Sequence, residues 1–325
     1  RKAVERGIPL FTSLDTANAL ANALTSRYSL GNVELVDINN MRTKHKKLTF
    51  TKMRGTGNDY LYFDCFDQTV ESPESLAVRL SNRRTGVGSD GIVLIMPSTI
   101  ADAKMRMFNA DGTEGSVAGN ALRCVCKYLY ENGHVRKDEM AVETGSGVKT
   151  AKLFIREDQV FSVLVDMGCP AFAPAKIPVK LDGDRVMMRP VFLAGEKREI
   201  SCVSMGNPHV VIFVEDVNRI PLEQVGPQIE TDSLFPERVN VSFAQIVDKN
   251  DIVMRVWERG IGETAACGTG ACAVAVAAVE NGFCTRGADI DVRLPGGTLV
   301  VRYQEDGKVW LTGDANTDFT GTIEI

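Results

Sequence analysis

The 325-residue chain is 44% hydrophobic and 24% charged, the composition of a globular protein long enough for two domains. Its formal net charge of −5 argues against a nucleic-acid partner or an anionic membrane surface, and no apolar run reaches the ~18 residues of a membrane span. No signal-peptide pattern opens the chain. Eight cysteines without a CxxC pair therefore predict reduced thiols in the cytoplasm, rather than disulfides or a metal site.

Residues 1–46 share no pattern with the rest of the chain. The stretches AVERGIPLFTSLDTANAL and VELVDIN resemble the C-terminal tail of the methylglyoxal-synthase-like domain of carbamoyl phosphate synthetase large chains. The matching stretch is too short to form that domain's site, and the basic run Lys44–Lys47 is typical of a solvated linker. We therefore expect residues 1–46 to be an N-terminal extension or fusion remnant that adds no side chain to a functional site.

From Leu48 onward, short β-rich stretches alternate with tight turns. The expected strands cover residues 48–53, 60–66, 92–96, 104–109, 142–144, 149–156, 160–166, 187–192, 199–204, 210–214, 240–245, 251–257, 289–294, 298–303 and 309–312. The expected helices cover residues 71–80, 119–132, 220–229 and 268–279. Arg84–Gly91 spells the letters GxGxxG, but a strand follows it rather than a helix, so no dinucleotide site is predicted.

The chain contains an internal repeat. A shift of 149 residues lays Met105–Gly133 over Met254–Gly282 without a gap, and eight of the 29 positions are identical. The same shift places Gly57-Asn58 on Gly206-Asn207. Two copies of one unit predict two similar domains, whose two buried helices can point their N-termini at one site.

The second repeat helix has a cysteine at its start. Gly268–Val279 is rich in alanine and valine and has no charge, so we expect a helix buried on all sides, ended by Gly282 in a left-handed conformation. Cys267 then lies at the N-terminus, where free backbone N–H groups and the helix dipole favour negative charge. This position predicts a lowered pKa for the Cys267 thiol and backbone amides able to bind a carboxylate.

Five motifs carry a resemblance to a known family: FTKMRGTGNDYLYFD, RRTGVGSDG, MRMFNADGTEG, SMGNPHVVIFVED and WERGIGETAACGTGACA. In this order, from about Lys47 to the C-terminus, the chain resembles diaminopimelate epimerases. The resemblance implies an α/β (α+β) fold of two pseudo-symmetric domains, each a β-barrel-like sheet around a central helix. It places domain 1 at residues 47–168, with C-terminal strands from about residue 313 to 325, and domain 2 at residues 169–312.

The resemblance implies a reaction that inverts a Cα, converting LL-diaminopimelate into meso-diaminopimelate for lysine and peptidoglycan precursor synthesis. One group removes the α-proton from one face while another returns a proton to the opposite face. No pyridoxal phosphate lysine motif is present, so we expect no cofactor and no metal. The family uses two cysteines, and Cys267 in ACGTGA matches the second.

The first catalytic cysteine of the family is replaced in this chain. The expected CGN motif reads Ala118-Gly119-Asn120, and alanine has no proton to give or take. Cys124 and Cys126 lie roughly two turns further along the predicted helix, about 9 to 12 Å away, so they cannot substitute. Because every other motif is intact, we favour a single inactivating replacement over a natural loss of two-base chemistry.

The resemblance also implies the remaining site residues. His209 and Glu258 would tune the cysteines. The implied substrate-binding residues are Asn58, Asn109, Gly119, Asn120, Asn207, Asn240, Glu258, Arg259, Gly268 and Thr269. Gly91 stands where some family members carry glutamine, which puts one contact to the distal end of the substrate in doubt. The family also suggests a homodimer.

Two other functions are compatible with these residues. One is a racemase or dehydratase of the same superfamily that acts on another amino acid. The other is a ligand-binding pseudoenzyme, which Ala118 motivates. Activity on diaminopimelate, compared with proline, hydroxyproline or histidine, separates the first alternative from the epimerase.

Overall fold

The computed structural model describes Asn18, Ala21 and residues 47–115 and 119–324. Asn18 and Ala21 are helical and exposed. The expected N-terminal extension otherwise lies outside the described residues, and so does Ala118. Leu48–Ile323 forms one compact unit, which contains both copies of the repeat.

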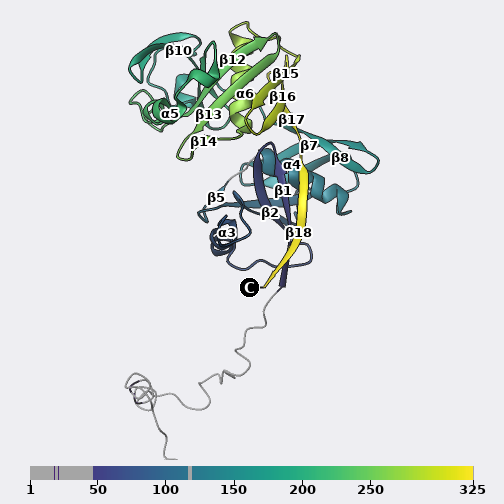
Figure 1. Ribbon diagram of the computed structural model, residues 1–325. Helices are drawn as coiled ribbons and strands as arrows, with labels where there is room; N and C mark the ends of the chain where they lie inside the picture. The colour runs from purple at the N-terminus through teal and green to yellow at the C-terminus, as the bar shows by residue number, and fades with distance from the viewer. Residues whose placement is uncertain (1–17, 19–20, 22–46, 116–118, 325) are drawn as a thin grey trace, which may run out of the picture. The chain divides into compact units, whose positions relative to one another are not determined.

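Each copy of the repeat folds into strands around one central helix (Figure 1). The first copy comprises β1 (Lys47–Gly55), β2 (Asn58–Asp64), α3 (Pro73–Ser81), β3 (Gly91–Met96), β4 (Ala103–Asn109), β5 (Glu114–Gly115), α4 (Gly119–Glu131), β6 (Glu139–Thr144), β7 (Gly147–Arg156) and β8 (Gln159–Asp166). The second comprises the short helices η1 (Pro174–Lys176) and η2 (Val217–Arg219), β9 (Arg189–Leu193), β10 (Glu196–Ser204), β11 (Pro208–Phe213), α5 (Leu222–Glu230), β12 (Asn240–Asp248), β13 (Asp251–Glu258), β14 (Gly262–Thr264), α6 (Gly268–Glu280), β15 (Asp289–Leu294), β16 (Gly297–Tyr303) and β17 (Val309–Gly313). A last strand, β18 (Asn316–Glu324), follows.

The 149-residue shift holds for whole elements. It carries β1 onto β10, α3 onto α5 and α4 onto α6, with both ends of each element matching. It also carries an ion pair onto its copy: Arg106 binds Glu114 through two hydrogen bonds, as Arg255 binds Glu263. The predicted fold of two pseudo-symmetric domains is confirmed.

Strand pairing follows one plan in both halves and joins them. In each half antiparallel hairpins alternate with two parallel pairs. The parallel pairs are β2 with β3 and β4 with β6 in the first half, and β11 with β12 and β13 with β15 in the second. The sheet crosses between the halves where β8 pairs with β17. Strand β18, yellow in Figure 1, then returns to pair with β1 of the first half.

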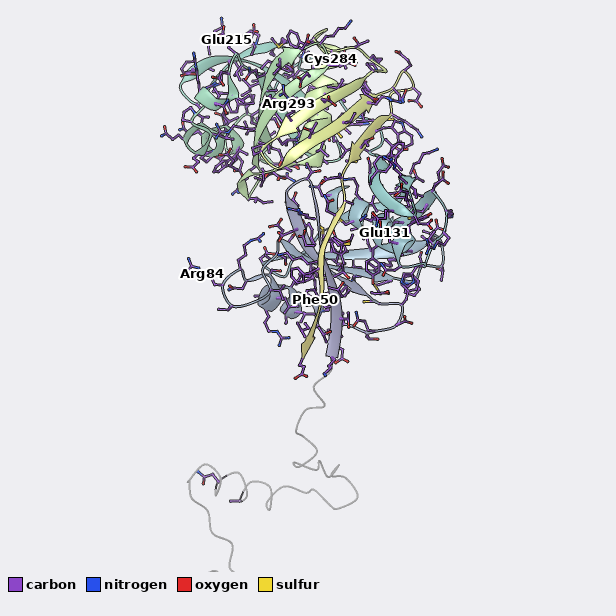
Figure 2. All side chains as sticks on the ribbon, turned by 45° about the vertical axis from the view of Figure 1, so that its right-hand side comes forward. Phe50, Arg84, Glu131, Glu215, Cys284 and Arg293 are labelled. Carbon is purple, nitrogen blue, oxygen red and sulfur yellow. The ribbon has the colours of Figure 1, made fainter. Side chains whose placement is uncertain are left out.

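The two central helices are the buried cores of the halves. Every residue of α6 from Gly270 to Ala278 is buried, because glycine, alanine, valine and cysteine let the surrounding strands approach on all sides. Gly282 has a φ of 79° and ends α6 as predicted, and its repeat equivalent Gly133, at 81°, follows α4. Figure 2 labels Glu131 at the end of α4 and Cys284 shortly after α6.

Helix α4 differs from α6 by a fully buried arginine. The guanidinium of Arg123 donates from Nε to the carbonyl of Asp314 (3.0 Å) and from Nη2 to Oγ1 of Thr56 (2.8 Å). The carboxylate of Asp314 in turn accepts from the N–H and the hydroxyl of Thr56, which has a φ of 47°. This network holds α4, the turn between β1 and β2, and the segment between β17 and β18 together, directly next to Asn58.

Gly91 lies where two strands approach too closely for any side chain. A Cβ built on Gly91 would lie 2.1 Å from the carbonyl oxygen of Phe108 on β4. A glutamine at this position, which the family resemblance suggests for some members, would therefore require β3 and β4 to move apart.

We expect Gly91→Ala to lower the free energy of unfolding by about 1–3 kcal/mol or more, because the overlap involves backbone atoms. Gly282→Ala provides the comparison, since its Cβ would meet nothing within 4 Å and its cost comes from the left-handed backbone alone, about 1 kcal/mol. Urea denaturation measures both. A Gly91→Ala variant as stable as the parent would show that the two strands relax freely.

Candidate functional site

The N-termini of α4 and α6 meet over one buried side chain. A Cβ built on Gly119 would lie 3.7 Å from Cδ2 of Leu311, and one built on Gly268 would lie 3.2 Å from the same atom. The Gly268 position is also 3.8 Å from Oδ1 of Asn120. The first turns of both helices have free N–H groups, so this meeting point combines two sets of donors and two positive dipole ends.

The first half brings Asn58 and Asn120 together with Asp90. Asn120 donates from Nδ2 to Oδ1 of Asn58 (2.6 Å), and Asn58 donates from Nδ2 to Asp90 (3.1 Å). Asn120 is buried, and within the described ranges no donor reaches its Oδ1. Asn109 is not part of this cluster and binds locally, donating to Oγ1 of Thr113 (2.9 Å).

The second half forms a chain of hydrogen bonds that ends on the Cys267 sulfur. Asn207 donates from Nδ2 to Oγ1 of Thr269 (3.2 Å), so the Thr269 hydroxyl can give its proton to Sγ of Cys267 (3.6 Å). Oδ1 of Asn207 accepts from Nε2 of His209 (2.9 Å). Each donor in this series points toward the Cys267 sulfur, which favours a thiolate. Among the described residues, Nδ1 of the buried His209 has no hydrogen-bond partner.

Burial and a carboxylate nevertheless keep Cys267 protonated. Burial raises the pKa of the Cys267 thiol well above its ordinary value, and the charge of Glu258 raises it further. Hydrogen bonds from Thr269 and from the N–H of Gly270 act in the opposite direction but are outweighed. The lowered pKa predicted from the helix N-terminus is therefore wrong for this structure, because the desolvation of the thiolate exceeds what the dipole supplies.

Glu258 is held beside the thiol by Thr264, which donates its hydroxyl proton to Oε1 (2.5 Å). Burial raises the pKa of Glu258, against hydrogen bonds from Thr264 and Cys267 that lower it. The charge of Asp90, from the first half, raises it as well. Side chains of both halves therefore act on one carboxyl group.

Arg259 lies in the turn after Glu258, and Asn240, the first residue of β12, holds the backbone of that turn. Asn240 is buried, and its side-chain amide bonds to two backbone groups. It donates to the carbonyl of Pro208 (2.8 Å) and accepts from the N–H of Arg259 (2.9 Å). The guanidinium of Arg259 donates to the carbonyl of Glu237 (3.0 Å). Burial, with a smaller effect of the Arg259 charge, lowers the pKa of His209 to about 3, so its imidazole is neutral at pH 7.

The structure thus gathers most of the residues expected from the sequence, with Ala118 outside the described part. Sequence reasoning missed three contributors: Asp90, Thr264 and Arg123. Asp90 follows the glycine-rich turn before β3, and Thr264 faces Glu258 across the β13–β14 hairpin. A polar residue at the end of a strand next to a predicted site residue is the signal that could have indicated both.

Comparisons with known proteins identify the family of this chain. A sequence profile described as Diaminopimelate epimerase matches residues 50–173 and 201–317. The diaminopimelate epimerase of Acetivibrio thermocellus is 48% identical over 279 residues, covering 86% of this chain and 99% of the relative. That of Desulfovibrio desulfuricans is 50% identical over 285 residues, with the same two coverages. The chain belongs to the diaminopimelate epimerase family.

Solved structures show the same fold at much lower identity. A PhzF-family phenazine biosynthesis protein of Bacillus anthracis has a TM-score of 0.63 at 18% identity, covering 86% of this chain and all of that one. A hydroxyproline epimerase of Agrobacterium vitis, with bound trans-4-hydroxy-L-proline, has a TM-score of 0.57 at 16% identity, covering 88% and 94%. These similarities concern the fold alone.

The part of the chain that the structure describes also gives information on membrane-spanning helices, metal ligands and the state of the cysteines. None of its helices is long and apolar enough to cross a bilayer. Within the same residues, no three histidine, cysteine or acidic side chains gather as ligands for a metal ion. All eight cysteines belong to this part and are free thiols.

Because His209 is buried as a neutral imidazole, the free energy of unfolding should fall as the pH is lowered. Its pKa of about 3 is depressed from the ordinary 6.5, so the unfolded chain binds more protons in between. The stabilisation is therefore complete above pH 6.5 and is lost as the pH falls toward 3. We expect His209→Gln to reduce the slope of unfolding free energy against pH in this window by up to about 1.4 kcal/mol per pH unit, measured by urea titrations. Equal slopes in both proteins would contradict a buried neutral imidazole.

The contact between Glu258 and Cys267 leads to a second prediction, on the reactivity of the Cys267 thiol in this chain. Glu258→Gln removes the charge that raises the Cys267 pKa, so more thiolate forms at pH 8. We expect alkylation of Cys267 by iodoacetamide, followed residue by residue with mass spectrometry, to become about three- to tenfold faster. The exposed Cys169 is the internal control and should react at an unchanged rate. Slower alkylation of Cys267 would show that Glu258 acts as its base rather than as an opposing charge.

Proposed function

We propose that this chain has the site of a cofactor-independent epimerase that converts LL-diaminopimelate into meso-diaminopimelate. The observation that carries the proposal is the meeting of two helix N-termini over Leu311, with Cys267 at the start of one of them. Relatives at 48% and 50% identity bear the name of this enzyme. A small-molecule substrate, without a nucleic-acid or membrane partner, and a cytoplasmic homodimer are part of the same proposal.

The two helix N-termini would hold the α-carboxylate of the substrate. Backbone N–H groups at Gly119 and Asn120 and at Gly268 and Thr269 are donors of the kind that bind carboxylates at helix starts. Asn58 and Asn207, one from each half, stand beside these donors and would orient the α-ammonium group and the side chain. The same N–H donors would also stabilise the negative charge that spreads onto the carboxylate oxygens as the α-proton leaves.

Cys267 would exchange a proton with one face of the Cα. In the resting site the thiol is protonated and the charge of Glu258 opposes its ionisation, so the thiolate that can remove the α-proton would form by loss of the thiol proton to solvent once the substrate is bound. The positive α-ammonium of the substrate favours this thiolate, as does the Thr269 hydroxyl. In the reverse direction, the protonated Cys267 donates its proton to the carbanion.

The opposite face requires a second acid or base, and Ala118 cannot provide one. This chain should therefore bind substrate and exchange an α-proton at one face, but should invert the Cα poorly. Ala118 equally supports a ligand-binding pseudoenzyme, the second candidate, while a racemase or dehydratase for another amino acid would use the same proton chemistry.

We expect Ala118→Cys to raise the rate of diaminopimelate epimerisation by about 10²–10⁴-fold, since it restores one positioned acid or base. The parent chain should incorporate deuterium from D2O at the α-carbon without inverting it, and Cys267→Ala should abolish this exchange. Mass spectrometry measures the exchange and chiral chromatography the inversion.

Each outcome of this comparison selects one function. Full-rate epimerisation by the parent chain would contradict a two-thiol mechanism. An Ala118→Cys variant that binds diaminopimelate but gains no activity would favour the pseudoenzyme. Activity of that variant on proline, hydroxyproline or histidine instead would assign the related racemase.

A further inference from the structure

A buried carboxylate lies directly behind the turn that carries Glu258 and Arg259. Glu230, the last residue of α5, is only 5% exposed. Its Oε2 accepts from the indole N–H of Trp257 (2.7 Å), and its Oε1 accepts from the backbone N–H of Gly260 (2.9 Å). A buried carboxylate is costly unless its oxygens are paired, and here both oxygens are used on this one turn.

The two donors to Glu230 flank the two functional residues in the sequence. Trp257 precedes Glu258, and Gly260 follows Arg259. The turn is closed by a hydrogen bond from the N–H of Ile261 to the carbonyl of Glu258 (3.0 Å), and Gly260 takes a φ of 77°. The two other backbone N–H groups of the turn donate to side chains: that of Arg259 donates to Asn240, and that of Gly260 donates to Glu230.

Helix α5 is itself fixed against the indole. A Cβ built on Gly226 would lie 2.6 Å from a ring carbon of Trp257, so only glycine allows the helix to lie this close to the ring. The end of α5, and with it the Glu230 carboxylate, is therefore placed by packing on the same side chain that donates to it. Within the described part of the chain, one long flexible group joins this arrangement, the largely exposed Arg238, whose Nη1 is 3.6 Å from Oε1.

The internal repeat provides a comparison within the molecule. The 149-residue shift places Ser81 at Glu230, Phe108 at Trp257 and Asn109 at Glu258. In the first half the side chain of Ser81 accepts from Ser89, and Phe108 has no N–H to donate from its ring. Of the two halves, the one whose turn carries the charged Glu258 and Arg259 is thus the one with the carboxylate and its indole donor.

We infer that Glu230 is a positioning residue that fixes Glu258 beside Cys267 and, through the same turn, the backbone of Arg259. The charge of Glu258 opposes ionisation of the Cys267 thiol, and the charge of Arg259 acts on the His209 imidazole. The hydrogen bonds of Glu230 hold the turn that carries both residues. The inference rests on the proposed function only where it treats these four groups as parts of one reaction site.

The test is a double-mutant cycle on the reactivity of Cys267, which requires no substrate. Glu230→Gln keeps the size of the side chain but replaces one acceptor by an NH2 group that faces an N–H donor. We expect the loosened turn to withdraw Glu258 and to accelerate alkylation of Cys267 at pH 8 by about three- to tenfold. In the Glu258→Gln background the same substitution should change the rate less than about twofold, because the charge through which it acts is absent.

Glu280→Gln is the matched control. Glu280 is also a largely buried carboxylate at the last residue of a helix, paired with Arg185 and Arg286, but it lies at the far end of α6, roughly 20 Å from Cys267. It should leave the alkylation rate unchanged. If Glu230→Gln fails to fold, Trp257→Phe removes one donor to Glu230 while keeping the ring against Gly226, and it should show the same dependence on Glu258.

Two results would overturn the inference. One is an alkylation rate unaffected by both Glu230→Gln and Trp257→Phe. The other is an acceleration that persists in the Glu258→Gln background, since general loosening of the fold would produce it. In the Ala118→Cys background, Glu230→Gln should lower kcat by about 10²-fold with little change in KM. If that background shows no epimerisation at all, the proposed function fails, while the alkylation cycle still decides the role of Glu230.

Discussion

The contact between the N-termini of α4 and α6 is the constraint on which the rest of the structure depends. Glycine at positions 119 and 268 lets both helices approach the Leu311 side chain, and a larger residue at 268 would crowd it. Each helix must then be buried along its length, which explains the small residues of α6. Each half of the sheet, in turn, curves around its helix to cover it. The pseudo-symmetry of the fold is the geometric consequence of pointing two similar helices at one place.

Much of the fold could be predicted from the sequence because the signals are local. The helix ends at Gly119, Gly268 and Gly282 agree with the structure, and most expected strands differ from the observed ones by a few residues at their ends. The strands β5 and β14 were not predicted, since two or three residues carry no periodicity. The pairing of β8 with β17, which makes the sheet continuous, joins residues that no local pattern connects.

The sequence indicated several residues that the structure brings together, but it did not indicate their electrostatics. Motifs and the repeat identified Cys267, His209 and Glu258, because each stands in a distinctive stretch of sequence. The ionisation of Cys267 could not be read in the same way, since the helix dipole is a local property whereas burial depends on everything packed around the thiol. Asn240 shows a related limit: its sequence context suggests a ligand contact, but its amide is used to hold Pro208 and Arg259.

The pairing of strand β18 affects how the protein folds during synthesis. This strand is synthesised after every other described strand, yet it belongs beside β1, the first strand of the compact unit. Asp314, just before it, also completes the contacts of Thr56 and Arg123 in the first half. During synthesis the first half therefore lacks both an edge strand and an acceptor for its buried guanidinium, so it cannot mature ahead of the second half as domains made first commonly do. Until β18 has been synthesised, the free edge of β1 is open to pairing with other nascent chains.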